Sequence, residues 1–240
     1  MRVRGDVQVE RIDARAFTVP TDEPESDGTF AWDSTTIVIV EVAGGGRSGL
    51  GYTYGDAAVA ELVRNLLADA VLGRDPLAVA GAWAAMQRRF RNTGRPGLGA
   101  MAVAAVDIAL WDLKARLLEL PLCTLLDAQH ENAPVYGSGG FTSYSNERLA
   151  EQLAGWLSTG IPRVKIKVGR HPDADPTRLD TAREAIGGET ELFFDAKALV
   201  ELGAGLRAGA GAPTTPLHPP AGKHGRLHEL ATGVGAKDDA

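Results

Sequence analysis

The start of the chain alternates apolar and polar residues with the period of β-strands. Apolar residues recur at strand spacing over residues 7–14, and residues 35–42 are β-branched almost throughout. A run of three glycines at 44–46 supplies a turn, after which residues 50–54 return beside the preceding strand. This pattern predicts a small antiparallel meander. The polar stretch 21–28 contains proline and ends in Asp-Gly, so we expect it to form an exposed, mobile loop.

The following segment has the period of α-helices. Asp56 is a suitable N-cap, and an apolar stripe with helical spacing follows it. Asp75 and Pro76 open a second helix, because proline is favoured at the first helical position. A third helix is expected from near Gly99 to Pro121, where proline marks its end. The sequence therefore predicts three helices after the meander.

After Asn132 the pattern changes to strands that alternate with amphipathic helices. The elements are, in order, a strand at 135–136, a helix at 146–158, a strand at 163–168, a helix at 175–187 and a strand at 191–195. The helices are long enough for the crossovers that parallel strands require. Repeated units of this kind predict a parallel sheet with helices outside it.

Composition and charge narrow the class of protein. The chain is 44% hydrophobic and 23% charged, the balance of a soluble globular protein. Its net charge of −6 favours neither nucleic acid nor an anionic membrane as a partner. No apolar run approaches the roughly 20 residues of a membrane span, and no apolar signal core follows the N-terminus. We therefore expect a cytoplasmic protein, in which the single cysteine, Cys123, is packed and unreactive.

The last part of the chain differs in composition from the rest. Half of residues 201–240 are Gly, Ala or Pro, and none of them is aromatic. Such a segment cannot bury enough apolar surface to offset its chain entropy, so we expect a disordered, low-complexity tail. The histidines at 218, 224 and 228 are expected to be solvated within it. The abrupt change near Ala196 suggests the product of a truncated or frameshifted gene.

The triplet Lys165-Ile166-Lys167 carries the most chemical information. Residues two apart on a strand point to the same side, so both lysines project away from the apolar residues that alternate with them. Two ammonium groups on one face disfavour each other's charge. A lysine that releases its proton readily can serve as a general base. The alternative interpretation is a strand end that carries two solvated lysines.

Asp195 ends the next strand along the chain. The carboxyl ends of parallel strands are where barrel enzymes build their active sites, and a carboxylate there is a natural oxygen ligand for magnesium. The alternative is an aspartate that caps the helix after the strand. An aspartate at this place, combined with two lysines on the neighbouring strand, favours the functional interpretation.

Three features follow one another in a recognisable order. They are the helix sequence Ala-Leu-Trp-Asp-Leu-Lys-Ala at 109–115, the strand Val-Lys-Ile-Lys-Val-Gly at 164–169, and Asp195. This order resembles the mandelate racemase and muconate-lactonising branch of the enolase superfamily, over roughly residues 7–196. The resemblance implies an enolase-like α+β N-terminal capping domain at 1–128, the first three βα units of an incomplete (β/α)8 barrel at 129–197, and the tail at 198–240.

The resemblance also implies roles for individual residues. Lys167 would abstract the proton α to a substrate carboxylate, and Lys165 would tune Lys167 and contact that carboxylate. Asp195 would be the first of three magnesium ligands. Ser138 and Tyr54 are candidate substrate contacts, the latter in a segment that would close over the substrate. For Ser138 and Tyr54 a purely structural role is the alternative.

The chain departs from the family pattern after the aspartate. The family continues Asp-Ala-Asn-Gly, whereas this chain reads Asp-Ala-Lys-Ala from Asp195 on. None of the later acidic residues ends an apolar strand, so the second and third magnesium ligands and the partner acid or base are missing. We therefore expect the 240-residue chain to bind magnesium weakly and to show no turnover.

The resemblance implies a lyase or isomerase that uses Mg²⁺ and acts on a small-molecule carboxylate. An acid-sugar dehydratase or racemase is the leading hypothesis. A cycloisomerase is the alternative within the superfamily, and a non-catalytic remnant of the capping domain is the alternative outside it. We expect neither a nucleic-acid nor a membrane partner, and a homo-oligomer is an option for a full-length form.

Overall fold

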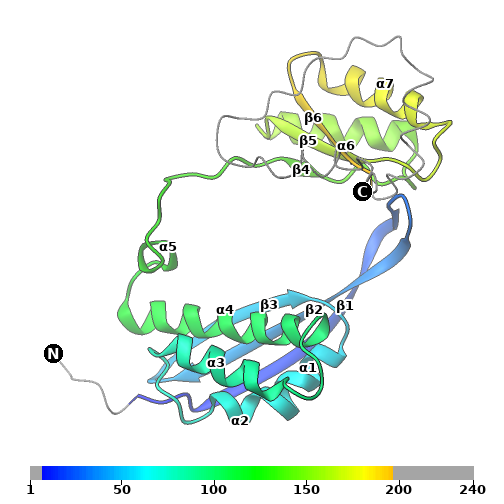
Figure 1. Ribbon diagram of the computed structural model, residues 1–240. Coiled ribbons are helices and arrows are strands. Elements are labelled where there is room, and N and C mark those ends of the chain that lie inside the picture. Colours follow the sequence, from blue (N-terminus) through cyan, green and yellow to red (C-terminus); the bar gives the residue numbers. More distant parts are fainter. Residues whose placement is uncertain (1–6, 197–240) are drawn as a thin grey trace, which may run out of the picture. The chain divides into compact units, whose positions relative to one another are not determined.

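The computed structural model describes residues 7–196, and the predicted tail at 198–240 lies outside the described residues (Figure 1). Its elements are, in chain order, β1 (Arg11–Ser26), β2 (Ala31–Gly44), β3 (Arg47–Tyr54), α1 (Ala58–Leu62), a π-helical turn η1 (Val63–Leu67), α2 (Ala68–Val71), α3 (Val79–Arg89), α4 (Leu98–Leu118), α5 (Leu122–Leu125), β4 (Gly137–Ser138), α6 (Asn146–Ser158), β5 (Arg163–Lys167), α7 (Asp175–Ile186) and β6 (Glu191–Asp195). Within the described residues, β1-β2-β3 form an antiparallel sheet and β4-β5-β6 a parallel one.

The antiparallel sheet and helices α1 to α4 share one hydrophobic core. On β2, Val38, Val40 and Val42 are fully buried, as expected for alternate residues of a strand with one covered face. Leu110 and Leu113 of α4 lie in the same core. The meander and the helices that the sequence predicts therefore form an α+β domain, which agrees with the expected capping domain.

Two glycines on β3 allow α4 to lie directly against the strand. A Cβ atom added at Gly49 or Gly51 would lie 2.2 or 2.0 Å from a carbonyl oxygen of α4, closer than any real contact. The backbone N–H of Leu50, between them, donates a 2.8 Å hydrogen bond to Asp112 of α4. The helix therefore packs closely on the buried face of β3, and its Asp112 satisfies one backbone donor of this edge strand.

The arm that β1 and β2 form is longer than expected. The prediction of an exposed, mobile loop at 21–28 was wrong, because β1 continues to Ser26 and pairs again with β2 after a register shift. Glu25 lies opposite Trp32 and accepts a 2.7 Å hydrogen bond from the indole N–H. Ser26 and Asp27 at the tip are only 2% and 4% exposed. We call residues 23–30 the hairpin tip.

The parallel sheet has β5 at its centre and helices α6 and α7 on one face (Figure 1). Val164, Ile166 and Val168 are buried against Leu149 and Leu153 of α6 and against residues of α7. The N-terminus of α6 is capped by Ser145, which accepts a hydrogen bond from the N–H of Arg148. The residues of β5 that alternate with this apolar set, including both lysines, therefore face away from the helices.

The single cysteine, Cys123, is exposed, so the expectation of a packed thiol was wrong. It lies in the short helix α5, which contributes no buried residue, because α5 packs mainly on the end of α4 rather than into a core. None of the helices in residues 7–196 combines the length and the apolar character that a membrane span requires.

Candidate active site

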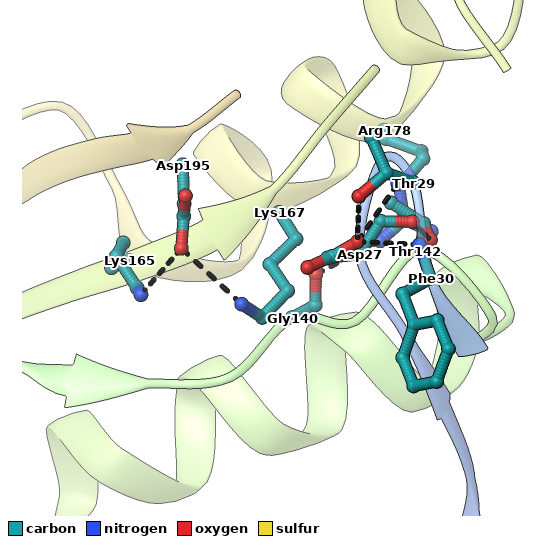
Figure 2. A network of polar contacts seen from close by, with 9 residues as sticks. All are labelled: Asp27, Thr29, Phe30, Gly140, Thr142, Lys165, Lys167, Arg178 and Asp195. Carbon is teal, nitrogen blue, oxygen red and sulfur yellow. Dashed lines mark hydrogen bonds and ion pairs between the residues drawn. The ribbon is translucent and has the colours of Figure 1, made fainter. Parts of the chain in front are cut away.

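Strands β5 and β6 bring three charged side chains together. Lys167 and Asp195 are register partners at the carboxyl ends of these parallel strands. Asp195 Oδ2 accepts hydrogen bonds from Lys165 Nζ at 3.0 Å and from Lys167 Nζ at 3.2 Å (Figure 2). The three side chains are only 18%, 10% and 21% exposed, in the order Lys165, Lys167 and Asp195. We call them the Lys–Asp–Lys cluster.

Aromatic rings flank both ammonium groups of the cluster. Lys165 Nζ lies 6.0 Å from the ring centroid of Tyr136, and Lys167 Nζ lies 5.5 Å from that of Phe141. Such rings attract a cation through their negative faces. The sequence predicts two lysines on one face of a strand and Asp195 at the end of the adjacent strand. The structure shows the carboxylate in contact with both ammonium groups, where its charge offsets their repulsion.

The pKa of Asp195 lies below its ordinary value. Burial is the largest influence and by itself would raise the pKa, but hydrogen bonds from Lys165 and Lys167, together with their positive charges, outweigh it. The folded state therefore favours the carboxylate form more than the unfolded chain does. This contribution to stability is present above the ordinary pKa of aspartate, about 4, and is lost as the pH falls through the lowered folded-state value.

Asp195→Asn is expected to lower the free energy of unfolding by about 2 kcal/mol at pH 7, because two charge-assisted hydrogen bonds lose their ionised acceptor. The difference between parent and variant should shrink as the pH falls below about 4, where the carboxylate of the unfolded parent becomes protonated, and should be lost once the pH is below the lowered folded-state pKa of Asp195. Urea unfolding followed by circular dichroism across a pH series measures both quantities.

An exposed ion pair on the same two strands provides the control for this experiment. Arg163 donates a 2.7 Å hydrogen bond to Glu191, and the two side chains are 33% and 56% exposed. Glu191→Gln should lower the free energy of unfolding by less than about 1 kcal/mol, because solvent screens exposed ion pairs. Equal losses in Glu191→Gln and Asp195→Asn would show that the cluster is no more than a surface ion pair.

The structure places the two candidate substrate contacts differently. Ser138 is exposed on β4 and is the register partner of Lys165, so it lies on the same face of the sheet as the cluster. Tyr54 is 64% exposed at the end of β3 and lines an open hollow of about 670 Å³ with residues of the hairpin tip. Phe141, beside Lys167, lines the same hollow. Tyr54 and Phe141 therefore line one hollow, and Phe141 is the lining residue whose ring lies beside the cluster.

Sequence reasoning missed the segment 139–144, which connects β4 to α6. Its Thr142 contacts the hairpin tip. Arg178 of α7 donates hydrogen bonds to three carbonyl oxygens of the segment, of which Figure 2 includes that of Gly140. One signal was available. A pair of glycines follows the short strand, and Gly140 has a φ of +55° and packs so closely that a Cβ atom would lie 2.6 Å from Ile166.

The described residues do not by themselves form a magnesium site. Magnesium binds oxygen ligands in near-octahedral geometry, whereas the cluster offers one carboxylate that already accepts from two ammonium groups. Across residues 7–196 there is no group of three or more His, Cys, Asp or Glu side chains that could hold a metal ion. The donor set is therefore incomplete for the ion that the sequence suggested.

Comparison with known proteins identifies relatives. Residues 11–127 match the family described as mandelate racemase / muconate lactonizing enzyme, N-terminal domain. A 3,6-anhydro-alpha-L-galactonate cycloisomerase from Streptomyces coelicolor is 33% identical over 88% of this chain and 60% of its own length.

Solved structures agree with this match. A mandelate racemase/muconate lactonizing enzyme-like protein from Rubrobacter xylanophilus is 62% identical with a TM-score of 0.77, over 78% of this chain and 52% of that protein. L-talarate/galactarate dehydratase from Salmonella typhimurium, liganded with Mg and L-lyxarohydroxamate, is 27% identical with a TM-score of 0.77, over 87% and 57%. The chain thus spans between 52% and 60% of the length of these relatives. Its sequence and its fold show that it belongs to the mandelate racemase / muconate lactonizing enzyme family of the enolase superfamily.

Proposed function

We propose that the described residues belong to an enzyme that abstracts the proton α to the carboxylate of an acid sugar, as a dehydratase or a racemase. Lys167 is the proposed general base. Lys165 is proposed to tune it and to contact the substrate carboxylate, and Ser138 and Tyr54 are proposed substrate contacts. Substrate names in the relatives support this class, because galactarate is an acid sugar with a proton α to a carboxylate.

The Lys–Asp–Lys cluster is the observation that carries the proposal. Two amines each lie within 3.2 Å of one carboxylate oxygen at the carboxyl ends of adjacent parallel strands. Lys167, at 10% exposure, is the more buried of the two lysines, and its amine also lies beside the ring of Phe141. A structural ion pair needs only one lysine, so the second supports a chemical role.

The strands and helices around the cluster have the arrangement expected for part of a larger barrel. We propose that β4, β5 and β6 with α6 and α7 are the first units of a (β/α)8 barrel, and that the capping domain occupies 1–128 and the partial barrel 129–197. The apolar face under the helices and the charged face opposite support this, because the strands of such barrels face helices outside and side chains inside.

Magnesium is the proposed cofactor of the complete enzyme, with Asp195 as one ligand. Support comes from the dehydratase structure liganded with Mg and from the place of the carboxylate at a strand end. The remaining oxygen ligands would have to come from outside the described residues. A second candidate activity is that of a cycloisomerase, which the 33% identity to the Streptomyces coelicolor enzyme over 88% of this chain favours.

A hybrid protein tests the proposed function. Residues 7–196 would replace the corresponding part of the Rubrobacter xylanophilus relative, whose 62% identity makes a compatible junction. Loss of the α-proton signal of galactarate and other acid sugars in D₂O, followed by NMR, reports proton abstraction whatever the final product. Magnesium-dependent exchange supports the proposal. A folded hybrid that exchanges none of a broad panel of acid sugars, while the intact relative does, would contradict it.

The 240-residue chain by itself is expected to bind magnesium only weakly and to catalyse no exchange. The reason is the single carboxylate of the cluster, since each missing oxygen ligand weakens a hard cation site. Titration calorimetry with magnesium and the same D₂O assay measure both properties. Robust magnesium-dependent exchange in this chain would show that the missing ligands lie within it.

A further inference from the structure

The backbone on both sides of Lys167 is anchored to the first turn of α7. The N–H of Lys167 donates a 2.9 Å hydrogen bond to the carbonyl oxygen of Gly140, which also accepts one from Arg178 Nη2 at 3.3 Å. Two residues later, the N–H of Gly169 donates a 2.9 Å hydrogen bond to Asp175 Oδ2. Asp175 and Arg178, one helical turn apart, thus hold the chain before and after Lys167 in place.

Arg178 is buried in a way that requires compensation. It is 7% exposed, and burial lowers the pKa of its guanidinium, although the charge of Asp175 opposes this effect. Its Nη1 donates to the carbonyl of Tyr144 at 2.8 Å and its Nη2 to that of Phe141 at 2.9 Å. Because a buried charge is costly unless hydrogen-bonded, these carbonyl contacts keep the guanidinium inside and hold the segment 139–144 in one conformation.

Segment 139–144 also contacts the hairpin tip. The N–H of Thr142 donates to the carbonyl of Ser26 and its Oγ1 to that of Asp27, both at 2.9 Å. Ser143 Oγ donates to the carbonyl of Pro24 at 2.7 Å. Figure 2 draws the contact between Thr142 and Asp27 in the same view as the Lys–Asp–Lys cluster. Segment 139–144 therefore connects the lysine strand, helix α7 and the tip of the capping sheet.

We propose that Arg178 is a positioning residue. By holding segment 139–144 in one conformation, it fixes the position of the Lys167 backbone and the position of the hairpin tip that contacts this segment. The importance of Lys167 rests on the proposed function, whereas the mechanical coupling does not. Arg178 donates to three carbonyl oxygens of the segment, those of Gly140, Phe141 and Tyr144. Its planar guanidinium directs its donors in fixed directions, which a lysine amine cannot match. Loss of Arg178 should therefore loosen two regions that are distant in sequence.

Hydrogen–deuterium exchange of the 240-residue chain tests the coupling without substrate or metal. In Arg178→Met, the amides of Thr142, Lys167 and Asp27 should exchange about tenfold faster or more, because all three residues lie in segment 139–144 or are hydrogen-bonded to it, and the segment loses its anchor on α7. Arg178→Lys should give a smaller increase at the same amides. The amides of β2 around Val40 should be unchanged and show that the capping core remains folded.

Two further variants separate coupling from general loosening. Arg183→Met is the matched control, because Arg183 also donates to three carbonyls, those of Gly187, Gly188 and Thr190, but at the other end of α7. It should affect only residues near 187–191. Thr142→Val removes the side-chain contacts to the tip and should speed exchange at Asp27 but not at Lys167.

Specific outcomes decide the proposal. It is overturned if Arg178→Met leaves Lys167 and Asp27 at parental exchange rates, or if Arg183→Met loosens them equally. If Arg178→Met unfolds the parallel sheet, Arg178→Lys decides by the same criterion. Failure of the hybrid enzyme to exchange α-protons would count against the proposed function and would leave this result unaffected.

Discussion

Lys167→Ala in the hybrid protein is expected to reduce α-proton exchange by a factor of about 100 to 10,000. This is the range that a positioned general base contributes. The substitution removes the amine that lies 3.2 Å from Asp195 and beside Phe141, and no other described group replaces it on that side of the cluster. Exchange rates measured by NMR in D₂O for parent and variant give the factor directly.

Two other lysines provide comparisons for this prediction. Lys165→Ala should also reduce exchange, because the proposed contact to the substrate carboxylate is lost, but the amine at Lys167 remains. Lys114, which lies over the Trp111 ring on α4, is the matched control, and Lys114→Ala should leave exchange unchanged. Exchange that persists in Lys167→Ala at the parental rate would assign the base to another residue.

The cluster could be predicted because it depends on local rules. The two-residue period of a strand places Lys165 and Lys167 on one face, and parallel pairing brings the ends of adjacent strands together. Neither rule needs knowledge of distant parts of the chain. What these rules could not provide was the distance between the groups, so the direct contact of both amines with one oxygen of Asp195 emerged only from the structure.

The hairpin tip could not be predicted from local pattern. Residues 21–28 are polar and contain proline, two features that are typical of loops. Both features are also compatible with a two-stranded arm in which β1 pairs with β2. Its order comes from Glu25 bonded to Trp32 and from Thr142, more than a hundred positions away in the chain. Tertiary contacts of this kind override local propensity, and a single sequence does not display them.

The role of Arg178 was hidden for a similar reason. On a helix that begins with Asp-Pro, an arginine three residues further on is normally a solvated residue. It is buried here because the carbonyls of segment 139–144 converge on it from 34 to 38 residues earlier in the chain. Carbonyl groups are present at every residue, so no side-chain pattern reveals where they converge.

Gly51→Ala is expected to destabilise the capping domain by about 3 kcal/mol or more. The new methyl group would lie 2.0 Å from the carbonyl oxygen of Ala105 and 2.6 Å from the backbone nitrogen of Ala109. Both are backbone atoms of α4, so no side-chain rotation relieves the clash, and the helix must move off the sheet. Its contact with β3 includes the hydrogen bond from Leu50 to Asp112, which that movement would break. Urea unfolding followed by circular dichroism measures the loss.

At Gly81, substitution by alanine should change the free energy of unfolding in the opposite direction. The comparison separates the effect of the clash from a general effect of alanine. Gly81 lies within α3, and a Cβ atom there would have nothing within 4 Å. Alanine is favoured over glycine inside a helix, so Gly81→Ala should stabilise the protein by about 0.5 to 1 kcal/mol. Because a helix shifted from β3 also exposes Leu110 and Leu113, Gly51→Ala should in addition speed amide exchange along α4. A stable Gly51→Ala variant with a protected α4 would mean that the strand and the helix are not in the close contact on which the capping core depends.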